Sequence, residues 1–156
     1  FGAYGHPDHI QAHRVAMYAA QLAAAPSFRP ELGAAWSISK IYWTAFSLSA
    51  VDRSRAAFQA SGERFWLDDA PEDGTPFACP DEWITTIVQD ESLEPIKRSA
   101  LEAHRTQITP DAVFLTIARL MGPVALGTEH FRLVHGSASP GPDGRERDLL
   151  AGIDLV

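Results

Sequence analysis

Cysteine is almost absent from this sequence: Cys79 is the only one among 156 residues. A single cysteine cannot form an internal disulfide, so the composition excludes a fold held together by disulfides within the chain. Such cysteine usage is typical of proteins in a reducing compartment. We therefore expect a cytoplasmic protein.

Long apolar runs and an excess of positive charge are also lacking. No stretch approaches the roughly 20 apolar residues that span a membrane, and no signal-peptide pattern stands at the start. The net charge is −7 and the isoelectric point is near 5.2. Without a basic excess, nucleic acid and anionic membranes are not expected as partners. The hydrophobic content of 46% is enough for one compact domain with a core.

The start of the chain is unusual. It begins at Phe1 instead of methionine, and three residues later it enters its most chemically distinctive segment. Chain ends tend to be disordered unless they are tied down, so a terminus is a poor place for an active-site loop. We therefore expect the chain to be the later part of a longer protein.

That distinctive segment is 4–13, which holds three of the six histidines. A proline follows His6, so His6 is expected in extended or turn backbone just outside a helix. Asp8 is a suitable N-cap, and Gln11 stands where a capping box would place it. The helix then carries His9 in its first turn and His13 four residues later on the same face.

The same segment has two interpretations. Neutral imidazole is a good zinc ligand, and catalytic zinc sites commonly take three ligands from histidine and carboxylate. His6, Asp8, His9 and His13 offer such groups. Histidines near a helix start are also often caps or solvent-exposed side chains. Spacing alone leaves both interpretations open.

The remaining pattern predicts an α/β protein. Residues 92–107 are expected to form a helix capped by Ser92, with Leu93, Ile96 and His104 on its inner face. A second helix is expected to begin at Pro110, with Thr109 as its cap and Phe114 facing inward. In full, the patterns predict helices at 8–25, 47–60, 92–107, 110–121 and 148–153, and strands at 40–46, 83–88 and 129–134.

The segment Tyr4-Gly-His-Pro-Asp-His9, followed by a helix containing His13, resembles the second signature motif of the LmbE/PIG-L superfamily of zinc-dependent N-acetylglucosamine deacetylases. Within it, the mycothiol-pathway deacetylases of N-acetylglucosaminyl-inositol are the most similar family. Further similar blocks stand at 40–44, 48–50, 100–107, 129–138 and 148–152. The superfamily's first motif, of the type Ala-His-Pro-Asp-Asp-Glu, supplies two zinc ligands and a carboxylate base. It has no counterpart in this sequence.

The resemblance implies a fold and a division of the chain. It implies the later part of a Rossmann-like LmbE-type fold, with a small C-terminal α+β subdomain. Residues 1–60 would end the Rossmann-like catalytic domain and carry the His-Pro-Asp-His motif, and residues 61–156 would form the subdomain.

The resemblance also implies roles for five residues. His9 matches the zinc-ligating histidine of the motif, and His6 matches a histidine that acts on the oxyanion or the leaving group. Tyr4 matches a tyrosine that can donate to the same oxyanion, although an aromatic packing role is the simpler alternative. Gln107 and Phe77 match substrate-binding positions, and the alternative for Gln107 is an exposed polar residue at a helix end. His13 and His130 have no role assigned beyond packing or lining.

The implied function is zinc-dependent hydrolysis of the acetamide of N-acetylglucosaminyl-inositol, a small-molecule substrate, with this chain supplying part of the active site. One alternative is a mycothiol S-conjugate amidase, although that motif tends to carry proline where this sequence has Gly5. Another is a non-catalytic, sugar-binding remnant, because the first motif is missing.

Overall fold

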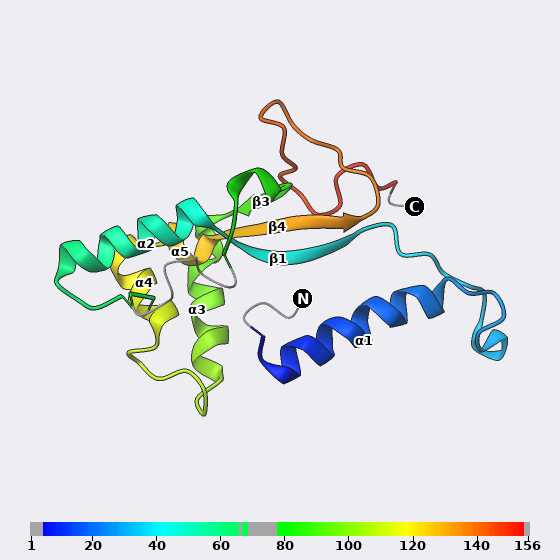
Figure 1. The fold of residues 1–156 in the computed structure, drawn as a ribbon, viewed down its shortest axis with the longest axis horizontal. Coiled ribbons are helices and arrows are strands. Elements are labelled where there is room, and N and C mark those ends of the chain that lie inside the picture. Colours follow the sequence, from blue (N-terminus) through cyan, green and yellow to red (C-terminus); the bar gives the residue numbers. More distant parts are fainter. Residues whose placement is uncertain (1–4, 66, 69–77, 155–156) are drawn as a thin grey trace.

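The fold is known from a computed structural model, which describes residues 5–65, 67–68 and 78–154. Its centre is a four-stranded sheet in the order β2-β1-β4-β3. β1 and β4 are the long central pair and run antiparallel, as β4 and β3 do, whereas β2 runs parallel to β1 (Figure 1). The strands are β1 (Ile41–Ser47), β2 (Ala78–Cys79), β3 (Thr86–Gln89) and β4 (Thr128–His135).

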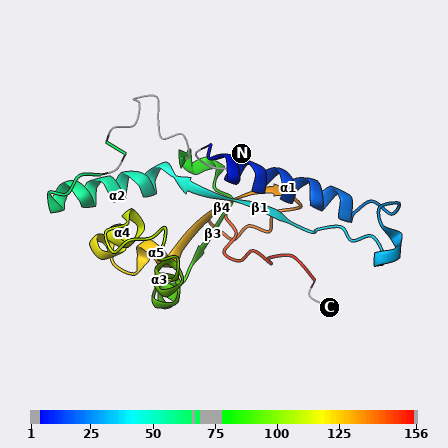
Figure 2. The same cartoon turned by 90° about the horizontal axis from the view of Figure 1, so that it is seen from below.

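Helices flank this sheet. Figure 2 shows α1 on one side of β1, and α3, α4 and α5 on the other. The helices are α1 (Pro7–Ala23), α2 (Leu48–Ser61), α3 (Glu94–Ala103), α4 (Val113–Met121) and α5 (Val124–Gly127), with short 3-10 turns at Pro30–Leu32, Asp81–Trp83 and Glu91–Leu93. The prediction of an α/β protein is confirmed. No described helix is long and apolar enough to cross a membrane.

α1 begins one residue earlier than its pattern predicted. His6 is the N-cap, with φ −62° and ψ 133°, so the prediction that it lies in extended backbone outside the helix is confirmed. Asp8 as the cap is wrong, because Pro7 takes the first helical position and Asp8 follows it. The Asp8 N–H instead donates to Nδ1 of His6 at 3.2 Å. Gln11 accepts from Arg14 at 3.2 Å.

β1 and α2 match their predictions to within a residue. Ser47 ends the strand and caps the helix, where its hydroxyl accepts from the Ala50 N–H at 3.1 Å. Gly62 ends α2 with φ +75°, a conformation that favours glycine. The buried core lies along this helix and comprises Val51, Phe58, Phe65 and Leu67, against which the half-buried Ala78, Val113, Ile117 and Leu120 pack.

The second half of the chain departs further from its predicted elements. β3 begins at Thr86 and not at residue 83, because Asp81–Trp83 forms a 3-10 turn. Asp90, and not Ser92, caps the turn before α3, since its carboxylate accepts from the Ser92 N–H at 2.9 Å. α3 then ends at Ala103, and the chain turns before α4 begins at Val113.

Several side chains expected to face inward are exposed. Leu93, Ile96 and His104 lie on the surface, because no described element covers that side of α3. Phe114 is exposed too, while its neighbour Leu115 is buried. The cap at Thr109 and the start at Pro110 are wrong, the short α5 was not predicted, and residues 148–153 form turns and not a helix.

A buried ion pair fixes the C-terminal segment to the sheet. The side chain of Glu146 is 0% exposed and that of Lys40 is 6% exposed, and their Oε1 and Nζ atoms lie 2.6 Å apart. The other oxygen of Glu146 accepts from the hydroxyls of Tyr42 at 2.8 Å and Thr86 at 2.9 Å. The Ser139 N–H donates to Oε1 at 2.8 Å. Both carboxylate oxygens are therefore fully engaged, as burial of a charge requires.

This network predicts a loss of stability in acid. Burial alone would raise the pKa of Glu146, but its donors, led by Lys40, lower the pKa from 4.5 to about 2. A carboxyl whose pKa is lowered by folding stabilises the fold above pH 4.5, and this contribution is lost as the pH falls towards 2. We expect a loss on the order of 3 kcal/mol across that window. Urea unfolding at a series of pH values measures this loss. If the free energy of unfolding of Glu146→Gln depended on pH in the same way as that of the unmodified protein, the prediction would be contradicted.

Candidate active-site segment

His6 and His9 stand together at the N-terminal end of α1. Their ring centroids are 5.6 Å apart, and the ring planes meet at 61°. Both residues are exposed. The arrangement follows from the local sequence, since Pro7 leaves His6 outside the helix as its cap and places His9 in the first turn. Two imidazoles therefore face one small region of space.

His13 lies one turn further along and points to the sheet. Its ring makes an edge contact with Trp43 of β1, at a centroid distance of 5.2 Å and an interplanar angle of 72°. It is half-buried. His13 therefore packs α1 onto the sheet, in line with the packing role expected for it.

These histidines do not complete a metal site by themselves. Within residues 5–65, 67–68 and 78–154, no group of three or more histidine, cysteine, aspartate or glutamate side chains is placed to hold a metal ion. A zinc ion in a catalytic site commonly takes three protein ligands. The exposed imidazole of His9 fits one ligand position, and the donor set of the described residues fits only part of a site.

The other predicted site residues are not gathered here. Tyr4 and Phe77 lie outside the described residues. Gln107 is exposed in the turn after α3, where its amide lies 3.4 Å from the Thr106 hydroxyl. Figure 2 shows α3 well apart from α1, with β1, β4 and β3 between them in that view. The structure therefore does not bring Gln107 to the histidines, and the roles of Tyr4, Phe77 and Gln107 stay predictions.

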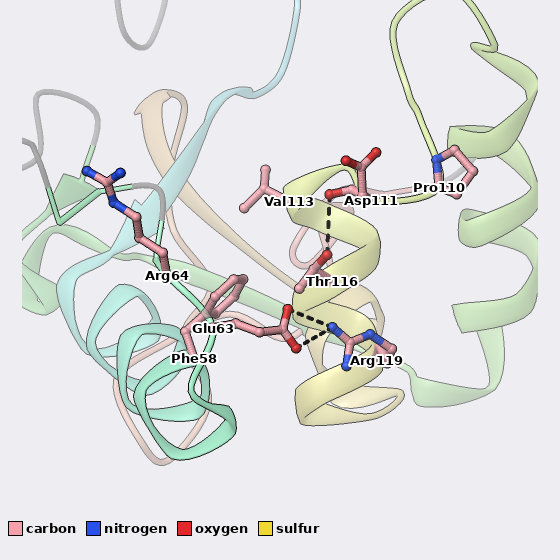
Figure 3. Close-up of a pocket in the computed structure, with 8 residues that line it drawn as sticks. All are labelled: Phe58, Glu63, Arg64, Pro110, Asp111, Val113, Thr116 and Arg119. Atoms are coloured by element: carbon pink, nitrogen blue, oxygen red, sulfur yellow. Dashed lines mark hydrogen bonds and ion pairs between the residues drawn. The ribbon is translucent and has the colours of Figure 1, made fainter.

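A cavity of about 720 Å³ lies between α2 and α4 (Figure 3). Glu63 and Arg119 face each other across it, with both carboxylate oxygens 2.7–2.8 Å from one guanidinium nitrogen. Its lining comprises Phe58, Glu63, Arg64, Pro110, Asp111, Val113, Thr116 and Arg119. No histidine and no residue of α1 is among them, so this cavity is separate from the histidine segment.

Glu129 and His130 of β4 belong to the sheet. Glu129 forms an ion pair with Lys97 of α3. His130 pairs with Ala45 and Ile87 on the neighbouring strands. Burial lowers the pKa of His130, and the nearby charge of Arg53 lowers it further. Both residues therefore have structural partners.

Glu146 has a structural role, as the centre of a buried hydrogen-bond network, that no local sequence pattern predicted. Two of the blocks that carry the family resemblance, 40–44 and 148–152, meet at its carboxylate. Lys40 and Tyr42 donate to Glu146, and Lys40 also donates to the Ala151 carbonyl. One sequence signal indicates the buried ion pair: Lys40, one of only two lysines, directly precedes an apolar strand. The block 148–152 therefore contributes to the fold through this network.

Comparison with known proteins places the chain among its relatives. No protein-family model matches it. It is 46% identical over 155 residues to a protein of Kribbella flavida named 1D-myo-inositol 2-acetamido-2-deoxy-alpha-D-glucopyranoside deacetylase, which covers 98% of this chain. The chain is related to these deacetylases over nearly its whole length. Proteins of the same name from Nocardioides sp. and Geodermatophilus obscurus are 46% and 45% identical and cover 98% and 97% of it.

The deacetylase relatives are longer than this chain. The match takes 51% of the Kribbella protein and 52% of each of the other two, so the chain spans about half the length of the curated relatives it matches. The resemblance to deacetylases of N-acetylglucosaminyl-inositol is thereby confirmed, since that compound is the one in the relatives' name.

Proposed function

We propose that this chain supplies the histidine-bearing part of a zinc-dependent deacetylase that acts on N-acetylglucosaminyl-inositol. The observation that carries the proposal is the 46% identity to a named deacetylase over 98% of the chain, joined to the pairing of His6 and His9 at one end of α1. The substrate is a small amino-sugar inositol, and the protein is proposed to act in the cytoplasm.

In this proposal His9 is a ligand of the metal and His6 is the acid. When bound, zinc lowers the pKa of a water and polarises the acetamide carbonyl. His6 lies beside His9 but outside the helix, so its ring can face the reacting amide. Because Nδ1 accepts from the Asp8 N–H, the proton of the neutral ring is on Nε2, which would donate to the oxygen that gains negative charge. As an imidazolium the ring would protonate the departing amine, and it would then lose the bond from Asp8.

The rest of the proposed site lies outside these two histidines. Tyr4 would donate to the same oxyanion, and Gln107 and Phe77 would contact the substrate. The remaining zinc ligands and the carboxylate base would come from a segment like the first motif of the superfamily. The proposed fold is then a Rossmann-like domain that ends near residue 60, followed by the subdomain of residues 61–156.

The backbone at Gly5 favours the deacetylase over the S-conjugate amidase. Gly5 has φ +88°, in the left-handed region that glycine adopts without strain. Proline, which the amidase motif tends to carry there, is fixed near φ −65° and cannot adopt this conformation. The path of the chain into His6 is therefore one that a proline would change.

The test uses a fusion protein in which the part of the Kribbella relative outside the match precedes this chain. We expect the zinc-loaded fusion protein to release acetate from N-acetylglucosaminyl-inositol, and to do so about tenfold or more faster than it cleaves a mycothiol S-conjugate. Faster cleavage of the conjugate would favour the amidase. A folded, zinc-loaded protein that releases no acetate would favour the non-catalytic remnant.

A further inference from the structure

α1 has the composition of a helix that is covered on two sides. No charged residue stands between Arg14 and Arg29, a stretch that takes in most of the helix and the turn after it. A helix at the surface of a protein normally carries polar side chains on its outer face, whereas a helix that is apolar all round is buried. The sequence of α1 therefore calls for a second covering surface.

The structure covers only one side. A stripe of Ile10, His13, Met17 and Ala20 is half-buried, with the 3–4 residue spacing of one helix face, and its His13 contacts Trp43 of β1. Yet none of the 17 residues of α1, all of them described, is buried. In Figure 2 the sheet lies on one side of α1, and no described element lies on the other.

The uncovered side is apolar. We define the outer face of α1 as Ala12, Val15, Ala16, Tyr18 and Ala19, all of which are exposed. Val15 is 66% exposed and Tyr18 is 63% exposed. The segment after α1 adds Phe28, Leu32 and Trp36, also exposed. The backbone N–H of Trp36 donates to the Ala23 carbonyl at 2.8 Å, which holds Trp36 near the end of the helix.

Two observations indicate what covers this face. The relatives carry about as many residues outside the match as within it, since the match takes only 51–52% of each. In addition, His9 belongs to the first turn of α1, and no described group of three or more histidine, cysteine, aspartate or glutamate side chains is placed to hold a metal ion there. On the proposed function, the other zinc ligands must converge on His9, so the segment that carries them must pass the N-terminal end of this helix.

We propose that the outer face of α1, continued by Phe28, Leu32 and Trp36, is the docking surface for the polypeptide segment that the relatives carry outside the match. α1 is then a middle layer between this segment and the sheet. The contact is apolar, because the outer face has no charged side chain, and burying it provides the stability that the exposed helix lacks. The placement at His9 rests on the proposed function, whereas the burial of the face does not.

Thiol labelling tests the docking. Replacing the one cysteine by Cys79→Ser gives a background into which Tyr18→Cys is introduced on the outer face. Ala56→Cys, at an exposed position of α2, is the matched control. We expect the Tyr18→Cys variant to react about tenfold or more slowly in the fusion protein than in the 156-residue chain. The Ala56→Cys variant should react equally fast in both. Equal rates for Tyr18→Cys in a folded fusion protein would overturn the proposal.

The second copy of this chain is the competing occupant. If it covers the face, Tyr18→Cys in the 156-residue chain will be protected and will lose this protection on dilution, which would also overturn the proposal. The outcome is independent of activity. Protection without acetate release would support the docking proposal and refute the deacetylase proposal. Acetate release without protection would support the deacetylase proposal and refute the docking proposal.

A second measurement tests the docking if the fusion protein fails to fold. The tagged chain is co-expressed with the separate segment of the Kribbella relative, and we expect the two to co-purify. Val15→Glu with Tyr18→Glu should abolish co-purification, whereas Ala56→Glu with Gln59→Glu, at the same spacing and at exposed positions of α2, should not. Failure of the unmodified pair to co-purify, or co-purification that survives the first pair of substitutions, would overturn the proposal.

Discussion

Glu146→Gln is expected to lower the free energy of unfolding by about 3–5 kcal/mol. The substitution keeps the size of the side chain but removes its charge, and Lys40, with a side chain 6% exposed, would then be a buried cation without a counterion. The amide group also cannot accept from all of Lys40, Tyr42, Thr86 and Ser139 as the carboxylate does. Because Glu146 joins the C-terminal segment to β1, that segment should also lose protection from hydrogen exchange.

A surface ion pair serves as the control. Lys97 and Glu129 also form an ion pair, but their side chains are 36% and 48% exposed. Glu129→Gln should therefore cost less than about 1 kcal/mol. Urea denaturation of both variants, followed by circular dichroism, measures the difference. Similar costs for the two substitutions would show that the network around Glu146 does not stabilise the fold as its burial indicates.

His9→Ala in the fusion protein is expected to abolish zinc binding and deacetylation together. His9 is the one exposed imidazole in the first turn of α1, and removing a metal ligand should cost more than the 10–100-fold loss typical of groups that only support a ligand. Zinc content by elemental analysis and acetate release are measured on the same sample. An unchanged zinc content in this variant would refute the assignment of His9.

His6→Ala is the matched variant, three residues away in the same segment. His6 is the N-cap and lies outside the helix, with its ring 5.6 Å from that of His9. We expect His6→Ala to keep its zinc and to lose turnover by about 10²–10⁴-fold, the range for general acid–base catalysis. A turnover number equal to that of the unmodified protein would exclude His6 as the acid.

The elements set by local sequence could be predicted well. β1 follows from a run of β-branched and aromatic residues, and α2 follows from Ser47 as a cap and Gly62 as a stop. The position of His6 outside α1 follows from the proline after it. In each case the deciding residues are neighbours in the chain, so no knowledge of the tertiary structure was needed.

The elements that depend on distant contacts could not be predicted from local sequence. The partners of Glu146 on β1 lie 104–106 residues away in sequence, and no local pattern joins them. The apolar face of α3 has the right period, but burial of Ile96 depends on a neighbouring element that the described structure does not place there. Phe114 and Leu115 are adjacent apolar residues, and the pattern predicted Phe114 as the buried one, whereas Leu115 is buried and Phe114 is exposed.

The candidate site was predictable in part for the same reason. His6 and His9 are close in sequence, and the helix cap between them fixes their geometry. Gln107 was assigned through family resemblance, and its position relative to His9 depends on how α3 and α1 lie across the sheet. Sequence spacing carries no information about that arrangement.

The zinc content of the purified 156-residue chain tests the central claim most directly. After dialysis against a weak chelator, we expect the chain alone to retain no zinc and the fusion protein to retain about one ion per molecule. On the proposed function, His9 is one ligand of a site that a second segment completes. About one tightly held zinc per 156-residue chain would contradict this account. It would mean that His6, Asp8, His9 and His13 form a metal site without any further segment.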